Sequence, residues 1–211
     1  MAASSPADSP FVLYVEGPRD RSLLDAWAFR VSPALASALA SVTVILGGCQ
    51  PLRAADHFRV ARAERGAARA LCVLDADRER RPPPERAREP GLEFFTWGRR
   101  HIESYLLVPD AIRRAVRMGS GDPRLARWLE RTLPAPDDED AYGELDAKGL
   151  FAHHGELQRL LGRPVRPVQV ARAMRRDELH ADVRELLERL RDGLAFGGPA
   201  RDDASGAPRG A

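Results

Sequence analysis

The chain has 211 residues, of which 44% are apolar and 30% are charged, and its formal net charge at pH 7 is only +2. This length suits one α/β domain with a helical annex, or two small domains, and the low net charge excludes a global field that would attract nucleic acid. The apolar runs are too short to span a membrane, and the N-terminus lacks the basic and apolar regions of a signal peptide. We therefore expect a cytoplasmic protein without a membrane partner.

Four short apolar runs predict β-strands, at residues 11–15, 42–46, 70–74 and 92–97. Leu23, Leu24 and Trp27 recur at helical spacing after the first run, and residues 51–65 predict a helix between the second and the third run. Strands that alternate with helices in this way favour right-handed βαβ units and a parallel sheet. Because the strands are almost continuously apolar, we expect helices on both faces of that sheet.

After Trp97 the pattern changes to helices alone, predicted at about 101–118, 123–133, 147–162, 167–176 and 180–194. The composition of residues 1–10 and 197–211 predicts disordered ends. The fold prediction is thus an α/β domain over residues 11–118, with a four-stranded parallel sheet and flanking helices. A C-terminal helical subdomain over residues 119–196 would follow and complete the functional site.

Acidic residues stand at the ends of two predicted strands. Glu16 follows the first strand and Asp20 lies one helical turn further on, while Asp75 and Asp77 follow the third strand. Ligands of parallel sheets bind at the carboxyl ends of the strands, so we expect the four side chains to converge there. Taken singly, each acid could equally be a helix cap or a solvated turn residue; the combination and its spacing favour a shared site.

Four converging carboxylates repel one another unless cations neutralise them. Carboxylate and water oxygens are suitable ligands for Mg²⁺ or Mn²⁺, and two such ions can stabilise both the attacking and the leaving oxygen of a phosphodiester. The acidic pattern therefore predicts a metal centre, with two ions of Mg²⁺ or Mn²⁺, suited to the cleavage of nucleic acid.

Two segments resemble the Toprim signature of topoisomerases, primases and several nucleases: VEGPRD at 15–20 and VLDADR at 73–78. Two more, TWGRRHIESYLLVPDAI at 96–112 and LDAKGLF at 145–151, resemble the Toprim part of the overcoming-lysogenization-defect (OLD) nucleases. The resemblance covers about residues 11–190. It implies a Rossmann-like Toprim fold and metal-dependent endonuclease cleavage or nicking of DNA, with a possible role in defence against phage or other foreign DNA.

The resemblance also implies roles for single residues. Glu16, Asp20, Asp75 and Asp77 would bind the metals, and Glu16 and Asp75 would also be catalytic. Glu103 would hold the second metal or position the site, and its alternative is an exposed glutamate at a helix start. Among 33 basic residues the only lysine is Lys148. The resemblance and this persistence of one lysine both suggest that Lys148 stabilises charge on the phosphate, where the alternative is a surface residue left by chance.

Four other features of the sequence give weaker indications of function. Arg78, Arg80 and Arg81 directly follow the Asp-x-Asp motif and could contact DNA phosphates, although neighbouring glutamates make a solvated loop equally plausible. The acidic run 137–140 predicts a solvated loop, and His153-His154 predicts a pair on a helix surface. Cys49 and Cys72 are expected to be buried thiols.

The chain departs from full-length OLD proteins because it contains no G-x-x-x-x-G-K-[ST] phosphate-binding loop. It would then be either a stand-alone Toprim protein or one that depends on a separate ABC-type ATPase partner. The leading hypothesis is a metal-dependent endonuclease acting on DNA; the alternative is a catalytically weak Toprim module that binds or regulates a partner ATPase. Oligomeric state is not predicted by the sequence.

Overall fold

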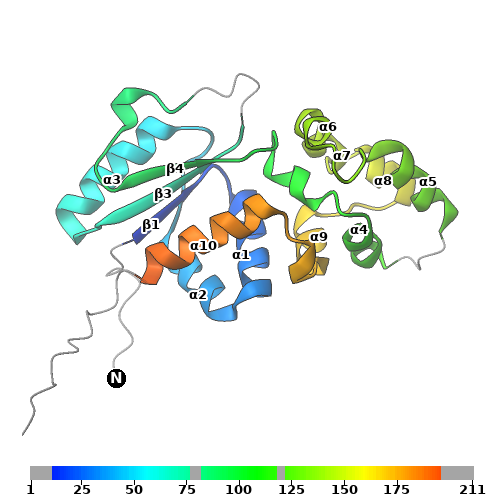
Figure 1. Ribbon diagram of the computed structural model, residues 1–211, viewed down its shortest axis with the longest axis horizontal. Helices are drawn as coiled ribbons and strands as arrows, with labels where there is room; N and C mark the ends of the chain where they lie inside the picture. Colours follow the sequence, from blue (N-terminus) through cyan, green and yellow to red (C-terminus); the bar gives the residue numbers. More distant parts are fainter. Residues whose placement is uncertain (1–10, 77–81, 118–121, 196–211) are drawn as a thin grey trace, which may run out of the picture.

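The computed structural model describes residues 11–76, 82–117 and 122–195. The predicted disordered ends and four candidate site residues, Asp77, Arg78, Arg80 and Arg81, lie outside these ranges. Figure 1 shows a sheet flanked by helices, from which a second group of helices extends to one side.

The sheet has four parallel strands in the order β2-β1-β3-β4. They are β1 (Phe11–Val15), β2 (Thr43–Ile45), β3 (Arg69–Leu74) and β4 (Leu92–Thr96). The chain first moves outward from β1 to β2 and then crosses back to place β3 on the other side of β1. This reversal creates a topological switch point between β1 and β3, and the carboxyl ends of those two strands are where such sheets bind ligands.

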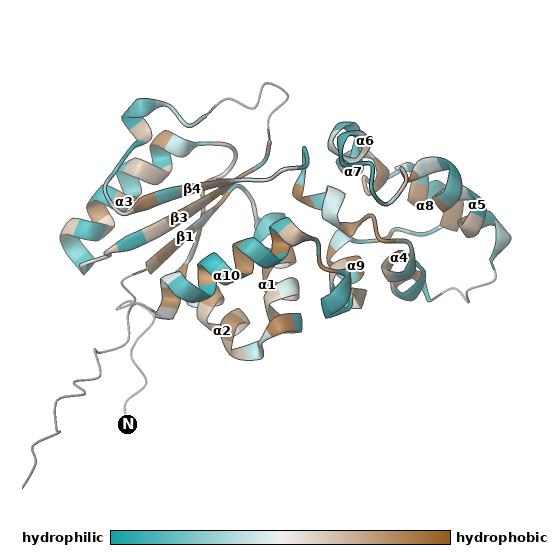
Figure 2. Ribbon diagram, viewed as in Figure 1, coloured by the Kyte–Doolittle hydropathy of each residue, from teal (hydrophilic) through white to brown (hydrophobic). Residues whose placement is uncertain are grey.

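Helices cover both faces of the sheet, as the apolar strands predict. Alternate residues of β1 point in opposite directions, so Leu13 and Val15 join a core with α1 (Pro18–Val31), α2 (Pro33–Val42) and α10 (Ala181–Ala195). Tyr14 instead packs on the opposite face with α3 (Pro51–Arg65) and the short 3₁₀ helix η2 (Glu85–Ala87). Figure 2 shows the strands as mainly hydrophobic, with the hydrophilic faces of α3 and α10 turned outward.

The remaining helices continue the chain from the end of β4 back to the sheet. They are η3 (Ile102–Leu106), α4 (Pro109–Val116), α5 (Pro123–Thr132), α6 (Glu139–Glu144), α7 (Ala147–Leu150), α8 (Glu156–Leu161), α9 (Pro167–Ala173) and η4 (Arg176–Glu178). One hydrophobic core runs from the sheet face into this group, and the Trp27 indole donates to Met174 Sδ at 3.3 Å across the junction. The domain boundary near residue 118 stays a prediction.

Two expected helices are interrupted. The helix predicted over 101–118 is η3 followed by α4, because Pro109 has no N–H and can only begin a new helix. The helix predicted over 147–162 ends at Leu150, and α8 begins at Glu156 after a turn in which His154 has a φ of 64°. The two histidines are exposed as expected, but they lie in this turn and not on a helix.

Three other expectations need correction. Helix α2 was not predicted; Pro33 starts it and the Ser32 hydroxyl caps it by accepting from Leu35 N at 3.3 Å. The acidic run at 137–140 is not simply a solvated loop, since Asp138 caps α6, which begins at Glu139. Cys72 is buried, but Cys49 is exposed because it lies in the bend beyond β2.

Within the described ranges, no helix has both the length and the hydropathy needed to cross a bilayer. The cytoplasmic location stays a prediction.

Candidate active site

Glu16 connects the ends of three strands. Its Oε1 accepts a hydrogen bond from Asp75 N at 2.8 Å, which ties the end of β1 to the end of β3. Its carbonyl oxygen accepts from the amides of Gly47 and Gly48, both at 2.9 Å, which brings in the turn after β2. These two glycines have φ values of 83° and 123°, a conformation that other residues rarely adopt. The sheet therefore fixes Glu16 through backbone groups.

Asp20 lies in the first turn of α1, where its Oδ2 accepts from Gly17 N at 2.6 Å. The pKa of Asp20 is raised to about 6, chiefly by burial and next by the charge of Asp75, while the Gly17 hydrogen bond opposes both effects. Glu103 and Glu16 also contribute to the rise. The four acids thus share one electrostatic neighbourhood, and we call Glu16, Asp20, Asp75 and Glu103 the acidic cluster.

Asp75 follows β3 and is held from the helical side as well as from the sheet. Its Oδ1 accepts from Ile102 N at 3.2 Å, and its Oδ2 accepts from Lys148 Nζ at 2.5 Å. Lys148 belongs to α7, a short helix whose start is capped by Asp146. The sole lysine of the chain therefore meets Asp75 from a distance of 73 residues in sequence.

Lys148 is well placed to remain a cation. Partial burial lowers its pKa, but the hydrogen bond to Asp75 and the charges of Asp75, Glu103 and Asp20 outweigh this, so that the net pKa is raised. Its side chain is 44% exposed, so one side of the ammonium group faces Asp75 while solvent reaches the rest. A ligand could approach Lys148 without displacing the protein core.

Glu103 is fully buried in η3, so the alternative of an exposed helix-start glutamate is wrong. Its Oε1 accepts from Arg19 Nη1 at 2.9 Å, but its Oε2 is buried without a hydrogen-bond partner in the described part of the chain. An unsatisfied buried carboxylate oxygen is costly. The oxygen donors of the acidic cluster therefore fit a cation that the described residues do not supply.

His101 belongs to the same site, although the sequence analysis did not select it. Its Nδ1 is 3.8 Å from Asp75 Oδ2, and its Nε2 is 3.9 Å from Asp146 Oδ1. Burial lowers the pKa of His101, and the nearby Lys148 lowers it further, while Asp75 acts in the opposite direction. Its position two residues before Glu103 was the only sequence signal that could have indicated it.

Comparisons with known proteins add a resemblance in fold. No protein-family model and no curated protein matches the chain. A solved structure that resembles it is the C-terminal region of the OLD protein of Xanthomonas campestris pv. campestris. The two are 18% identical, with a TM-score of 0.46 over 89% of this chain and 97% of that one. At such low identity the likeness concerns only the path of the chain.

The acidic cluster is not a preformed metal site. Among the residues that the structure describes, no three Asp, Glu, His or Cys side chains are arranged to hold a metal ion. Lys148 hydrogen-bonds Asp75 in this arrangement, and Asp77 lies outside the described residues. The structure brings Glu16, Asp20, Asp75, Glu103 and Lys148 together; their roles stay predictions.

Proposed function

We propose that this protein is an endonuclease that uses Mg²⁺ or Mn²⁺ to cleave or nick DNA phosphodiesters. The observation that carries the proposal is the buried Glu103 carboxylate, whose Oε2 has no protein partner among the described residues although it lies close to other acids. Among the described residues, the four carboxylates of this site outnumber the two cations that contact them, Lys148 and Arg19, and they offer oxygen ligands.

The acidic cluster and Asp77 would hold the metals. When bound, two such ions stabilise the attacking and the leaving oxygen of a phosphodiester. Glu16 and Asp75 lie at the switch point of the sheet, where β1 and β3 end, and their mutual hydrogen bond fixes the position of both. Asp20 and Glu103 add carboxylates from α1 and η3.

Lys148 would bind a phosphate oxygen. Its ammonium group already donates to Asp75 and is 44% exposed, so a second donated hydrogen bond towards a ligand is available. An ammonium group is compact and can rotate, whereas a guanidinium group is wide and planar. Arg78, Arg80 and Arg81, which follow Asp77 in sequence, are proposed to contact the DNA backbone.

A second candidate function keeps one observation in its favour. Because no three described acids converge as ligands, the chain could instead be a catalytically weak module that acts on an ABC-type ATPase partner. The two functions differ in whether metal supports cleavage by the isolated chain.

Plasmid nicking tests the proposal directly. Purified protein should convert supercoiled plasmid to the nicked or linear form with Mn²⁺ or Mg²⁺, and a chelator should stop the reaction. Asp75→Ala should lower the nicking rate by roughly 1000-fold, because Asp75 is a proposed metal ligand that also contacts Lys148 and the Ile102 amide. The fold should stay intact. Asp56→Ala removes an exposed carboxylate on α3 and is the matched control. Cleavage by Asp75→Ala at the wild-type rate would contradict the proposal.

A further inference from the structure

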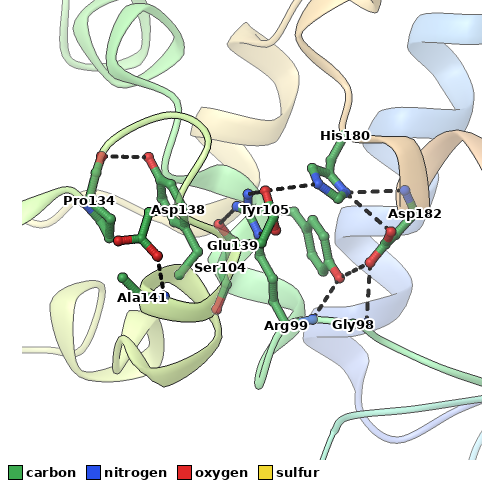
Figure 3. A network of polar contacts seen from close by, with 11 residues as sticks. Gly98, Arg99, Ser104, Tyr105, Pro134, Asp138, Glu139, Ala141, His180 and Asp182 are labelled. Carbon is green, nitrogen blue, oxygen red and sulfur yellow. Dashed lines mark hydrogen bonds and ion pairs between the residues drawn. The ribbon is translucent and has the colours of Figure 1, made fainter.

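Arg99 is a buried charge that the function proposed above does not use. It follows β4 by three residues, and its side chain is only 9% exposed. Its guanidinium donates to both oxygens of Glu139, at 3.0 and 2.7 Å, and to the carbonyl oxygen of Ser104 at 3.0 Å (Figure 3). It also lies over the ring of Tyr142, 4.1 Å from the centroid. Only a planar, multidentate cation can make this set of contacts.

A second group of contacts, around Asp182, lies beside the contacts between Arg99 and Glu139. Asp182, near the start of α10, accepts hydrogen bonds from the Tyr105 hydroxyl and from Gly98 N. The same hydroxyl accepts from Arg99 N at 3.0 Å. His180 connects the two groups of contacts, since its ring nitrogens lie 3.3 Å from Glu139 Oε1 and 3.4 Å from Asp182 Oδ1 (Figure 3). We call Arg99, Tyr105, Glu139 and Asp182 the Arg99 clamp.

The Arg99 clamp holds both ends of one short segment. Gly98 and Arg99 are bound at its start, and Ser104 and Tyr105 at its end. Between these ends the segment carries His101, Ile102 N and Glu103, and all three belong to the candidate active site. The partners of the clamp come from α6 and from the start of α10, which are remote in sequence from the segment that they hold.

Burial of an arginine is costly unless its donors are well paired, and an apolar side chain would fill the same space at less cost. The charge at Arg99 is therefore better explained by what it orients than by stability alone. We propose that Arg99 and Glu139 are positioning residues, which keep the segment 98–105 in the conformation that presents Glu103 and the Ile102 amide to the metal centre. This inference rests on the proposed function.

The positioning role predicts that loss of Glu139 weakens metal binding. Without Glu139 the guanidinium loses its bidentate partner, and the segment is no longer fixed at both ends. Because outer contacts of this kind orient metal ligands, Glu139→Ala should weaken Mn²⁺ binding by roughly 10- to 100-fold. The KM for DNA should change much less than kcat, since Glu139 does not lie among the proposed DNA contacts. Glu139→Gln retains one acceptor oxygen and should restore part of the affinity.

The experiment compares the wild type with Glu139→Ala, Glu139→Gln and a control. Glu139 is half exposed, so its removal leaves no buried cavity. Glu89→Ala is the matched control, because Glu89 accepts two hydrogen bonds from Arg59 on the α3 side of the sheet. Hydrogen exchange of peptides covering 98–106 reports the position of the segment, and titration calorimetry with Mn²⁺ reports the metal centre. Exchange should become faster and Mn²⁺ affinity lower in Glu139→Ala, both changes should be smaller in Glu139→Gln, and neither should occur in Glu89→Ala.

The two readouts separate the inference from the function on which it rests. If exchange becomes faster in Glu139→Ala although the wild type binds no Mn²⁺, the positioning of the segment stands and the metal-dependent function fails. If the wild type binds Mn²⁺ and Glu139→Ala binds it equally well, the positioning role is overturned whatever the exchange shows. Unchanged exchange overturns it as well.

Discussion

The two sides of the acidic cluster are held in different ways. On the sheet side, Glu16 and Asp75 follow adjacent parallel strands, and backbone hydrogen bonds of the sheet and its turns fix them. On the helical side, the side chains of Glu103 and Lys148 each make one hydrogen bond among the described residues, to Arg19 and to Asp75, and side-chain contacts fix the segment that carries Glu103. The difference indicates that the sheet side should tolerate substitution in its surroundings, whereas one lost contact can displace the helical side.

Among substitutions that keep the charge or the shape of a side chain, the largest effect should come from the helical side. Lys148→Arg retains the charge but replaces a compact ammonium group by a wide, planar one, so it should lower the nicking rate by roughly 100-fold. Every other basic residue of the chain outside the histidines is an arginine, so charge alone does not explain this lysine. Plasmid nicking at saturating Mn²⁺ measures the effect, and Arg21→Lys, at a partly exposed position of α1, is the control. Normal cleavage by Lys148→Arg would assign Lys148 a structural role only.

The same glutamate-to-glutamine substitution on each side of the acidic cluster tests how the two sides differ. Glu103→Gln removes a buried charge whose Oε2 has no hydrogen-bond partner among the described residues, while the remaining carbonyl oxygen can still accept from Arg19, so the free energy of unfolding of the metal-free protein should rise by about 1 kcal/mol. In Glu16→Gln the side-chain oxygen can still accept from Asp75 N, and only partial burial is relieved, so the rise should be less than half as large. Both variants should bind Mn²⁺ more weakly.

Urea denaturation at neutral pH, with a chelator present, measures the two stabilities. Equal increases would show that the two sides do not differ in the way that their contacts suggest.

The same contrast explains what the sequence could predict. Strand ends are visible as the limits of apolar runs, so Glu16, Asp20 and Asp75 could be selected from the sequence and assigned to one edge of a parallel sheet. Lys148 was selected through its rarity and a family resemblance, but its contact with Asp75 depends on tertiary packing. His101 and Arg99 gave no comparable signal, because their partners are distant in sequence and belong to elements whose packing no local pattern specifies.

The helical region also contains most of the errors in the predicted elements. Prolines and glycines allow several short helices to replace one long one, as at Pro109 and Gly155. The acidic run before α6 illustrates the same limit. It reads as a solvated loop in sequence, yet Glu139 within it pairs with a buried arginine 40 residues away.

The last expected effect concerns pH and lies at the start of α1. The pKa of Asp20 is raised from 3.8 to about 6 in the folded protein, first by burial and then by the charge of Asp75. The folded state therefore binds a proton more tightly than the unfolded state. The resulting stabilisation is complete below the unfolded pKa and is lost as pH rises through about 6. Metal-free protein should lose about 1–2 kcal/mol of unfolding free energy from this group between about pH 4 and about pH 7, after allowance for solvent screening.

Asp20→Asn tests this origin of the pH dependence. The amide oxygen can still accept from Gly17 N, but the charge that Asp75 repels is gone, so the variant should be more stable than the wild type at neutral pH and equally stable near about pH 4. Urea denaturation across this range measures the slope, with Asp56→Asn on α3 as the control. Addition of Mg²⁺ should flatten the slope of the wild type, because a bound cation replaces the proton as the neutralising charge. A wild-type slope that Mg²⁺ leaves unchanged would mean that Asp20 is not a metal ligand, even if its carboxylate is repelled by Asp75.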